Sequence, residues 1–415
     1  MKHLFYAAIA LMAVCAVGKA AETPGVIEIR QSNGGFCYAT FSPDGTKIVT
    51  AAKDNTARIW CAQTGRELRT LPHADWVRHA VFSPDGTKII TGGSELTARI
   101  WYAESGRLLQ RLEGHGETEG FHVVGGVQRR FANWVYPAIF SPDGKKVLTT
   151  GGDKTVRIWD VETGKELHKL EGHLDHVRII VFTPDGKKAI SASQDANVKI
   201  WDVDTGKELH NLEGSAYATH RPAPALLSPD GARIVLGSRN ANTATIRCVE
   251  SGEELLVLEG HESWLLTAAF SPDGKKIVTT SSDETARIWC AESGRELQRL
   301  QGDPNDRHRN VLFNMPPPPG IDSFAKVQFD YAAFSPDGRK VFTTGNPHDR
   351  VIRVWDVETG KELHTFGGHE QELTLAFALS PDGKKLVTHG WSLTVHIWDL
   401  ENLPTPVLRP AIRNF

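Results

Sequence analysis

Aromatic and basic side chains recur at one fixed position of this chain, eight residues before the tripeptide Pro-Asp-Gly. Large flat side chains of these types supply much of the binding energy of protein interfaces, because they lose water and still make polar contacts. The pattern predicts recognition of a partner and not covalent chemistry. The residues at this position are Trp76, Trp134, His176, Arg221 and Trp264, and two positions later stand Arg78, Tyr136 and Arg178.

Sequence motifs of catalysis do not occur in the chain. There is no Gly-x-Ser-x-Gly, no His-Glu-x-x-His, no phosphate-binding glycine loop and no calcium-binding loop. His122 and His308 could approach each other and bind a metal ion, but their spacing does not favour this over two hydrated side chains. We therefore predict no catalytic residue, no metal and no cofactor.

The tripeptide Pro-Asp-Gly divides the chain of 415 residues into repeated units. It occurs eight times, and five of the seven spacings lie between 41 and 45 residues, while the other two are 58 and 64. A fixed period of this length is typical of repeat architectures. The copies begin at Pro43, Pro84, Pro142, Pro184, Pro229, Pro272, Pro336 and Pro381.

Each unit is predicted to form four short strands. Asp-Gly between β-branched runs indicates a hairpin, since glycine accepts the positive φ of a tight turn. A lone sheet of this size cannot bury both of its faces, so the units must stack and close into a ring. We predict an all-β protein with eight four-stranded antiparallel sheets.

The units resemble the WD-repeat β-propeller family over nearly the whole chain after residue 20. Trp-Asp closes the third predicted strand at Trp159-Asp160, Trp201-Asp202, Trp355-Asp356 and Trp398-Asp399. Gly-His precedes the first strand at Gly114-His115, Gly172-His173, Gly260-His261 and Gly368-His369. The resemblance implies a single eight-bladed β-propeller, and relatives of this kind act mostly as assembly platforms.

The resemblance also implies a buried hydrogen-bond network in each blade. Its members are the His, a strand Ser or Thr, an acid six residues before the Trp, and the Trp itself. The fourth and sixth units carry the full set, which is His173, Ser193, Asp195 and Trp201, and His261, Ser281, Asp283 and Trp289.

The ends of the chain predict how the ring closes. Residues 26–30 read as an outer strand that precedes the first unit, and the eighth unit supplies three strands before a proline-containing tail. We expect the N-terminal strand to complete the last blade. The alternative is a seven-bladed ring without the fifth unit, in which Arg247 replaces the Trp.

The family architecture implies that the aromatic and basic positions share one rim of the ring. We define the rim as Trp76, Arg78, Trp134, Tyr136, His176, Arg178, Arg221, Trp264 and Trp391. Two insertions, near 116–132 and 303–325, precede first strands and follow units that are four apart, so we expect them to face each other on this rim. The alternative is that each Trp packs on its own loop and that the insertions are neutral.

Charge and the N-terminal segment predict where the protein acts. The balance of 47 Lys and Arg against 50 Asp and Glu, a formal charge of −3, argues against nucleic-acid binding. Residues 1–20 combine a basic start, an apolar run and small residues before Ala20, which is typical of a signal peptide. We predict export to the periplasm or beyond, with residues 21–415 as the mature propeller and no membrane span; an uncleaved anchor is the alternative.

These observations favour a non-catalytic exported scaffold, a monomer or a subunit of a complex, that binds a protein or peptide partner through the rim. A carbohydrate- or small-ligand-binding protein, or a hydrolase, that uses the channel mouth is the alternative function. A third possibility is a module of a complex whose enzyme is a different protein. The four cysteines after residue 20 are expected as buried free thiols, since three of them occupy equivalent positions of separate units.

Overall fold

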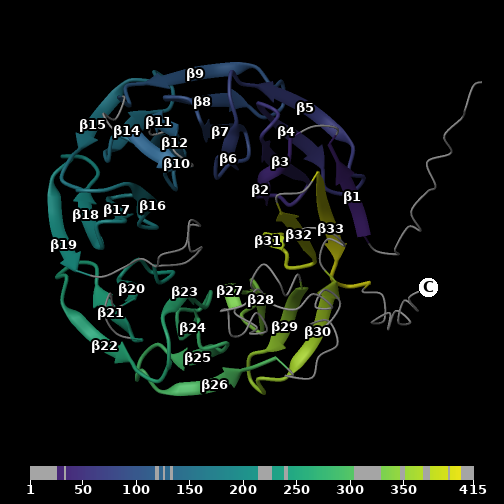
Figure 1. Cartoon of the computed structure of the whole chain (residues 1–415), viewed down its shortest axis with the longest axis vertical. Coiled ribbons are helices and arrows are strands. Elements are labelled where there is room, and N and C mark those ends of the chain that lie inside the picture. The colour runs from purple at the N-terminus through teal and green to yellow at the C-terminus, as the bar shows by residue number, and fades with distance from the viewer. Residues whose placement is uncertain are drawn as a thin grey trace, which may run out of the picture.

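The computed structural model describes residues 26–31, 34–116, 121–124, 127–130, 134–213, 227–237, 242–302, 329–345, 351–367, 374–390 and 393–402. Every regular secondary-structure element assigned in these residues is a β-strand. Eight antiparallel sheets are arranged as blades around a central axis (Figure 1), and two further strands form a separate two-stranded sheet. The predicted eight-bladed all-β propeller is confirmed.

The first four blades each contain four strands in sequence order, from the centre outwards. Blade 1 is β2 (Phe36–Phe41), β3 (Lys47–Ala52), β4 (Thr56–Cys61) and β5 (Glu67–Pro72), and blade 2 is β6 (Val77–Phe82), β7 (Lys88–Gly93), β8 (Thr97–Tyr102) and β9 (Leu108–Glu113). Blade 3 is β12 (Val135–Phe140), β13 (Lys146–Gly151), β14 (Val156–Asp160) and β15 (Glu166–Leu170), and blade 4 is β16 (Val177–Phe182), β17 (Lys188–Ser193), β18 (Asn197–Asp202) and β19 (Glu208–Glu213).

The second half of the ring repeats this order, with one exception in blade 5. Blade 5 has β20 (Arg233–Gly237), β21 (Ala244–Cys248) and β22 (Glu254–Leu258), and a single bridge from Leu227 to Ile234 stands where the innermost strand would pair. Blade 6 is β23 (Leu265–Phe270), β24 (Lys276–Ser281), β25 (Ala286–Cys290) and β26 (Glu296–Leu300), and blade 7 is β27 (Phe329–Phe334), β28 (Lys340–Gly345), β29 (Val351–Asp356) and β30 (Glu362–Gly367). Blade 8 contains β31 (Thr374–Leu379), β32 (Lys385–Gly390) and β33 (Thr394–Asp399).

The N-terminal strand closes the ring. Strand β1 (Val26–Arg30) pairs antiparallel with β33, with Val26 opposite Trp398 and Arg30 opposite Thr394. It is therefore the outermost strand of blade 8, as predicted. Ile29 of this strand is buried in one hydrophobic cluster with residues of blades 1 and 8, so the two ends of the chain share a core.

The Pro-Asp-Gly turns form a second continuous ring. Their glycines have φ between 68° and 71°, which the Asp-Gly hairpin signal requires. A Cβ on each glycine would lie 2.6–3.9 Å from the Cδ of the proline in the preceding blade, and the series closes where Gly45 of blade 1 meets Pro381 of blade 8. Eight glycines thus allow eight turns to pack edge to edge.

The hydrophobic core lies between consecutive blades and not inside them. Ile200 of blade 4, Ile246 of blade 5 and Trp289 of blade 6 belong to one buried cluster. Each blade therefore depends on its two neighbours, as expected for a repeat architecture. Because blade 5 is packed between blades 4 and 6, the seven-bladed alternative is wrong.

Candidate interaction rim

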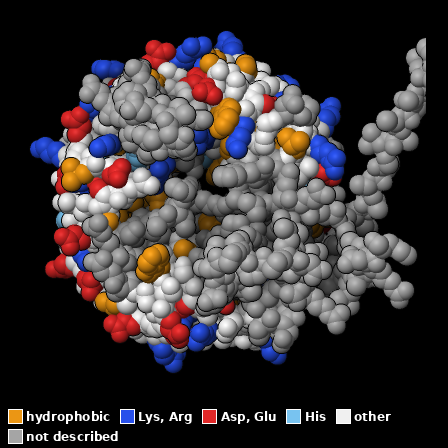
Figure 2. Space-filling model, in the orientation of Figure 1, with side chains coloured by type: hydrophobic (Ala, Val, Ile, Leu, Met, Phe, Trp, Pro, Cys, Tyr) orange, Lys and Arg blue, Asp and Glu red, His pale blue; other side chains and the backbone are white. Residues whose placement is uncertain are grey.

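Strand direction places the rim at one face of the ring. Successive strands run antiparallel, so the loops that precede the innermost strands lie at the same end of each blade as the turns between second and third strands. We call this the upper face. The Pro-Asp-Gly turns and the turns between third and fourth strands lie at the other end, which we call the lower face. Side chains of both charges and several hydrophobic side chains are exposed around the ring in Figure 2.

Trp76 stands between two cations at the border of blades 1 and 2. Its indole is 42% exposed. Lys53 Nζ, from the turn after β3, lies 5.3 Å from the ring centroid, and the guanidinium carbon of Arg78 lies 6.0 Å from it. Arg78 also donates a hydrogen bond to Ser94 Oγ over 3.1 Å. Cations at this distance from an aromatic face are attracted by its electrons, so the three side chains form one aromatic and basic group.

A second group of the same kind joins blades 3 and 4. The rings of Trp134 and His176 are 5.4 Å apart between centroids, and the guanidinium carbon of Arg178 lies 5.0 Å from the Trp134 ring. Trp134 is half-buried by these contacts. Its contacts to His176 and Arg178 come from the neighbouring blade and not from its own loop.

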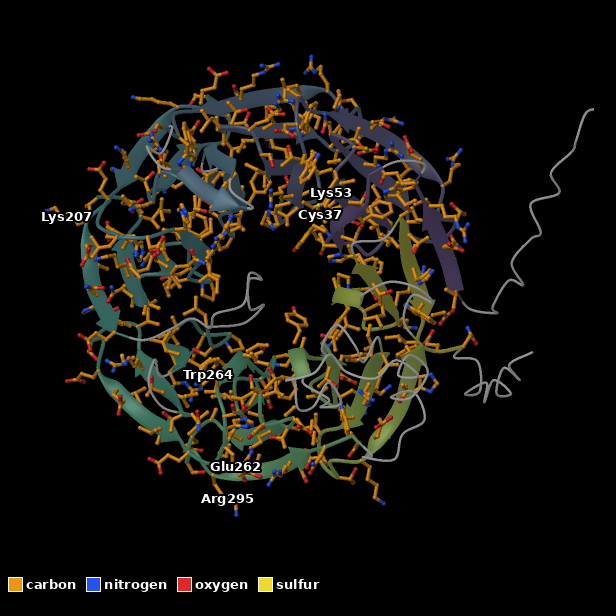
Figure 3. All side chains as sticks on the ribbon, viewed as in Figure 1. Cys37, Lys53, Lys207, Glu262, Trp264 and Arg295 are labelled. Atoms are coloured by element: carbon orange, nitrogen blue, oxygen red, sulfur yellow. The ribbon has the colours of Figure 1, made fainter. Side chains whose placement is uncertain are left out.

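Trp264 is the most exposed tryptophan among the described residues. It is 77% exposed and lies on blade 6, across the ring from Lys53 and Cys37 of blade 1 (Figure 3). Leu174, in the loop before β16, is also 77% exposed. Of the other predicted rim residues, Tyr136 lies on β12, and Arg221 and Trp391 lie outside the described residues.

The backbone holds the rim residues in equivalent positions. In four blades the carbonyl of the residue before the innermost strand accepts a hydrogen bond from the turn between the second and third strands. These bonds run from Ser94 N to Trp76 O, Gly152 N to Trp134 O, Gln194 N to His176 O and Ser282 N to Trp264 O, over 2.8–3.0 Å. The rim side chains are therefore presented from a fixed backbone.

The His and acid networks lie directly beneath the rim. In blade 4, His173 Nδ1 lies 3.0 Å from the Asp195 carboxylate, and His173 Nε2 lies 2.8 Å from Ser191 Oγ. The indole N–H of Trp201 donates to the same hydroxyl over 2.8 Å. If the imidazole is neutral, it donates a hydrogen bond to Asp195 and accepts one from Ser191. Each donor and acceptor of this network then has a partner.

The hydroxyl in this network differs from the prediction, which names Ser193 and Ser281. In blade 6 the corresponding atom is Thr279 Oγ1, 2.7 Å from His261 Nε2 and 2.8 Å from Trp289 Nε1. Residues two apart on a strand point to the same side, so sequence alone does not distinguish them. Ser193 instead donates to the carbonyl of Asp175, and Ser281 to that of Ser263. These bonds fasten the loop just before His176 and Trp264 of the rim.

A third complete network occurs in blade 3, where the sequence prediction missed it. His115 Nδ1 lies 2.9 Å from Asp153 Oδ1, its Nε2 lies 2.8 Å from Thr149 Oγ1, and Trp159 donates to the same hydroxyl. The first insertion separates His115 from its blade in sequence. The Gly-His signal before this insertion could have identified it.

Burial and hydrogen bonding shift the pKa values of these groups. Burial alone would raise the pKa of Asp283, but hydrogen bonds from His261, Thr285 and the N–H of Glu262 lower it below its ordinary value. Burial lowers the pKa of His173, and its hydrogen bond with Asp195 opposes part of this shift. Burial would also raise the pKa of Asp195, but hydrogen bonds from the N–H groups of Leu174 and Asn197 and from His173 lower it. The Asp195 carboxylate is therefore ionised and the His173 imidazole neutral at pH 7, which matches the donor pattern above.

The first insertion contributes a hairpin to the upper face. Strands β10 (Phe121–Val124) and β11 (Val127–Arg130) pair antiparallel, with His122 opposite Arg129. The second insertion and His308 lie outside the described residues. In the described part of the chain, no three His, Cys, Asp or Glu side chains are grouped as a metal site would require.

The cysteine prediction is correct for bonding and wrong for burial. Cys37, Cys61, Cys248 and Cys290 are free thiols, and all four are partly exposed. Cys61, Cys248 and Cys290 end third strands on the lower face, where the Asp of Trp-Asp stands in other blades.

Comparison with known proteins assigns the repeated units to a family. The family model described as WD domain, G-beta repeat (WD40) matches residues 30–61, 65–102, 106–160, 164–202, 252–290, 330–356 and 360–399. These seven matches cover more than half of the chain. Residues 203–251 lie outside the matches, and they include strands β20 and β21 of blade 5 and the Arg247 that replaces its tryptophan.

Curated relatives share the repeats over part of their length. The chain is 27% identical to nuclear distribution protein PAC1 of Arthroderma benhamiae over 66% of this chain and 61% of that protein. It is 29% identical to serine-threonine kinase receptor-associated protein of Gallus gallus over 33% of this chain and 35% of that protein. It is 37% identical to target of rapamycin complex subunit wat1 of Schizosaccharomyces pombe over 18% of this chain and 24% of that protein. In each case the chain spans less than two thirds of the relative.

The closed ring of four-stranded blades, the Trp and His networks and the seven family matches agree with one another. The chain belongs to the WD40 repeat family.

Proposed function

We propose that the rim binds a protein or peptide partner and that the protein is a non-catalytic, exported interaction scaffold. The exposure of Trp264 is the observation that supports this best, since 77% of this side chain faces water on a backbone held by hydrogen bonds. Burial of an indole in a partner would release a large apolar area from water. WD40 propellers generally bind protein partners, and two of the relatives are named for association with other proteins.

The basic groups around the other rim tryptophans support the same proposal. Lys53 and Arg78 flank Trp76, and Arg178 covers Trp134. Tryptophan and arginine together are enriched at the centres of protein interfaces. A partner that buries Trp76 would also meet two cations, so the rim favours a segment with both apolar and acidic side chains.

The test is the combined replacement of Trp76, Trp134 and Trp264 by alanine in the full chain, followed by co-purification from the exported fraction of the native host. We expect at least ten-fold less partner than with the native protein, measured by quantitative mass spectrometry. The control carries Leu167→Ala, Leu209→Ala and Leu363→Ala, which remove three exposed apolar side chains from outer strands. Equal recovery by the rim variant, with an unchanged circular dichroism spectrum, would contradict the proposal.

We also propose that residues 1–20 direct export and are removed, so that the scaffold acts in the periplasm or outside the cell. The basic start, the short apolar run and the small residues before Ala20 support this. No helix among the described residues is long and apolar enough to cross a membrane. The test is the N-terminal sequence of protein from fractionated host cells. Ala21 as the first residue in the exported fraction is expected, and an intact Met1 in the cytosolic fraction contradicts export.

A further inference from the structure

A groove of about 880 Å³ opens on the lower face between blades 1 and 2. Its walls include Lys47, Asp85, Tyr102, Glu104 and Arg107. The equivalent groove between blades 3 and 4 measures about 390 Å³. Small-molecule sites in proteins are typically clefts of about 300–1,000 Å³, so the first groove has the size of a ligand site and lies on the face opposite the rim.

The groove between blades 1 and 2 lacks an ion pair that the smaller groove between blades 3 and 4 has. In four other interfaces, the lysine that begins the second strand of one blade forms an ion pair with an acid in the turn between the third and fourth strands of the next blade. These pairs are Lys88–Glu162, Lys146–Asp204, Lys188–Glu250 and Lys276–Glu358. The structure describes both Lys47 and Glu104, and it records no ion pair between them. Lys47 and Glu104 both line the larger of these two grooves, and neither is held by an ion pair with the other.

Tyr102 gives the groove an aromatic wall. It occupies the position of Asp160 and Asp202, whose carboxylates cap their own turns by accepting from Thr163 and Thr205. Blade 2 therefore has an aromatic ring at the position where blades 3 and 4 have an aspartate that accepts hydrogen bonds from its turn. The guanidinium carbon of Arg107 lies over the Tyr102 ring, 5.2 Å from its centroid, so a cation stacks on the aromatic ring at the groove.

The charges of the groove favour a neutral polar ligand. Lys47 and Arg107 carry positive charge, while Asp44, Asp85 and Glu104 carry negative charge. The hydrogen bonds made by Ser42 and Thr46 lower the pKa of Asp44 to about 2, so this carboxylate is ionised at neutral pH. An anion or a cation would meet like charge inside the groove. Hydroxyl groups can donate to the carboxylates and accept from the cations.

We propose that this groove binds a neutral oligosaccharide, with a sugar ring against Tyr102 and its hydroxyls bonded to Lys47, Glu104 and Arg107. The C–H face of a pyranose is apolar and suits an aromatic wall, while its edge carries donors and acceptors. Sugar binding here is independent of the rim, because the two surfaces lie at opposite ends of the blades.

The test is isothermal titration of the full chain with maltotriose, cellotriose and triacetylchitotriose, with trigalacturonate and chitosan trimer as charged probes. We expect millimolar or tighter binding of at least one neutral trisaccharide. Tyr102→Asp, which introduces the residue found at this position in blades 3 and 4, should weaken it at least ten-fold, and Tyr102→Phe should retain it. Binding of the charged trimers alone, or of none of the five probes, would overturn the proposal.

Matched variants separate this groove from other parts of the protein. Asp204→Ala, in the narrower groove of blades 3 and 4, and the triple rim variant should both bind the sugar like the native protein. If the rim variant is folded but no longer binds the sugar, the sugar site lies on the upper face, and the proposed site in the groove is wrong. Equal affinity of Tyr102→Asp and the native chain would do the same. The melting temperature of each variant shows that it is folded.

Discussion

His115 Nδ1 lies 2.9 Å from the carboxylate of Asp153, although 38 residues and the β10–β11 hairpin separate them in sequence. The same carboxylate accepts the backbone N–H of Gly116 over 3.1 Å. The start of the insertion is thus fixed to blade 3 by a half-buried acid, in the way that Asp195 and Asp283 fix the loops of blades 4 and 6.

We expect Thr149→Val to destabilise the protein by roughly 1–3 kcal/mol, because it leaves the buried N–H of Trp159 and the ring nitrogen of His115 without a partner. The shape of the side chain is retained, so little packing is lost. Urea unfolding followed by fluorescence measures the change in the free energy of unfolding. Leu167→Ala, at an exposed position of β15, is the control. A variant as stable as this control would show that the network contributes nothing.

Stability should fall as the pH drops from 7 towards 4. Burial lowers the pKa of His79 to about 4, against an opposing backbone hydrogen bond, and burial also lowers the pKa of His73 and His173. The folded state then binds fewer protons than the unfolded chain, whose histidines titrate near pH 6.5, so unfolding is favoured below that pH. For His79 alone the loss is roughly 2–3 kcal/mol at pH 4.5.

Protonation of acidic side chains should lower the free energy of unfolding further at lower pH. Burial would raise the pKa of Glu95, but hydrogen bonds with His73 and Ala74 and the charge of Arg99 lower it to about 2. A depressed carboxyl pKa stabilises the fold above the unfolded value of about 4.3, and this is lost as the pH falls towards 2. Urea midpoints at intervals from pH 7 to 3 measure both declines. His79→Gln should flatten the first one, and an identical profile would contradict the assignment to His79.

Removal of strand β1 should open the ring. Deletion of residues 1–30 exposes the edge of β33 and removes Ile29 from the cluster shared by blades 1 and 8. We expect a drop of at least 10 °C in melting temperature, whereas deletion of residues 1–25 should leave it unchanged. Ile29→Ala, which keeps the backbone pairing, should cost about 2–4 kcal/mol. Equal melting of the two truncated chains would show that β1 does not hold the ring closed.

The four thiols in the described part of the chain should react in a fixed order. Burial raises the pKa of the Cys37 thiol, while hydrogen bonds from Thr64, Ser251 and Ser293 lower the pKa values of Cys61, Cys248 and Cys290. Since the thiolate is the reactive form, iodoacetamide at pH 7.5 should label the three lower-face cysteines before Cys37. Peptide mass spectrometry over time gives the order. Labelling of Cys37 at the same rate as the others would contradict it.

The sequence by itself determines the architecture. The period of the Pro-Asp-Gly turns sets eight blades, the Asp-Gly step sets the hairpins, and the strand Val26–Arg30 predicts closure, because each depends on short-range signals repeated in every unit. Even within a blade, the sequence does not choose between Ser191 and Ser193, since both point to one side of the strand and only the pairing of strands decides which one meets Trp201.

Contacts between blades were decided by the tertiary structure alone. Three features are formed by residues of two neighbouring blades. They are the contact of Lys53 with Trp76, the contact of Arg178 with Trp134, and the groove beside Tyr102. Their side chains meet because the buried surfaces of neighbouring blades fix the rotation and spacing of each sheet. A repeat period carries no information about these distances, which depend on how whole blades pack.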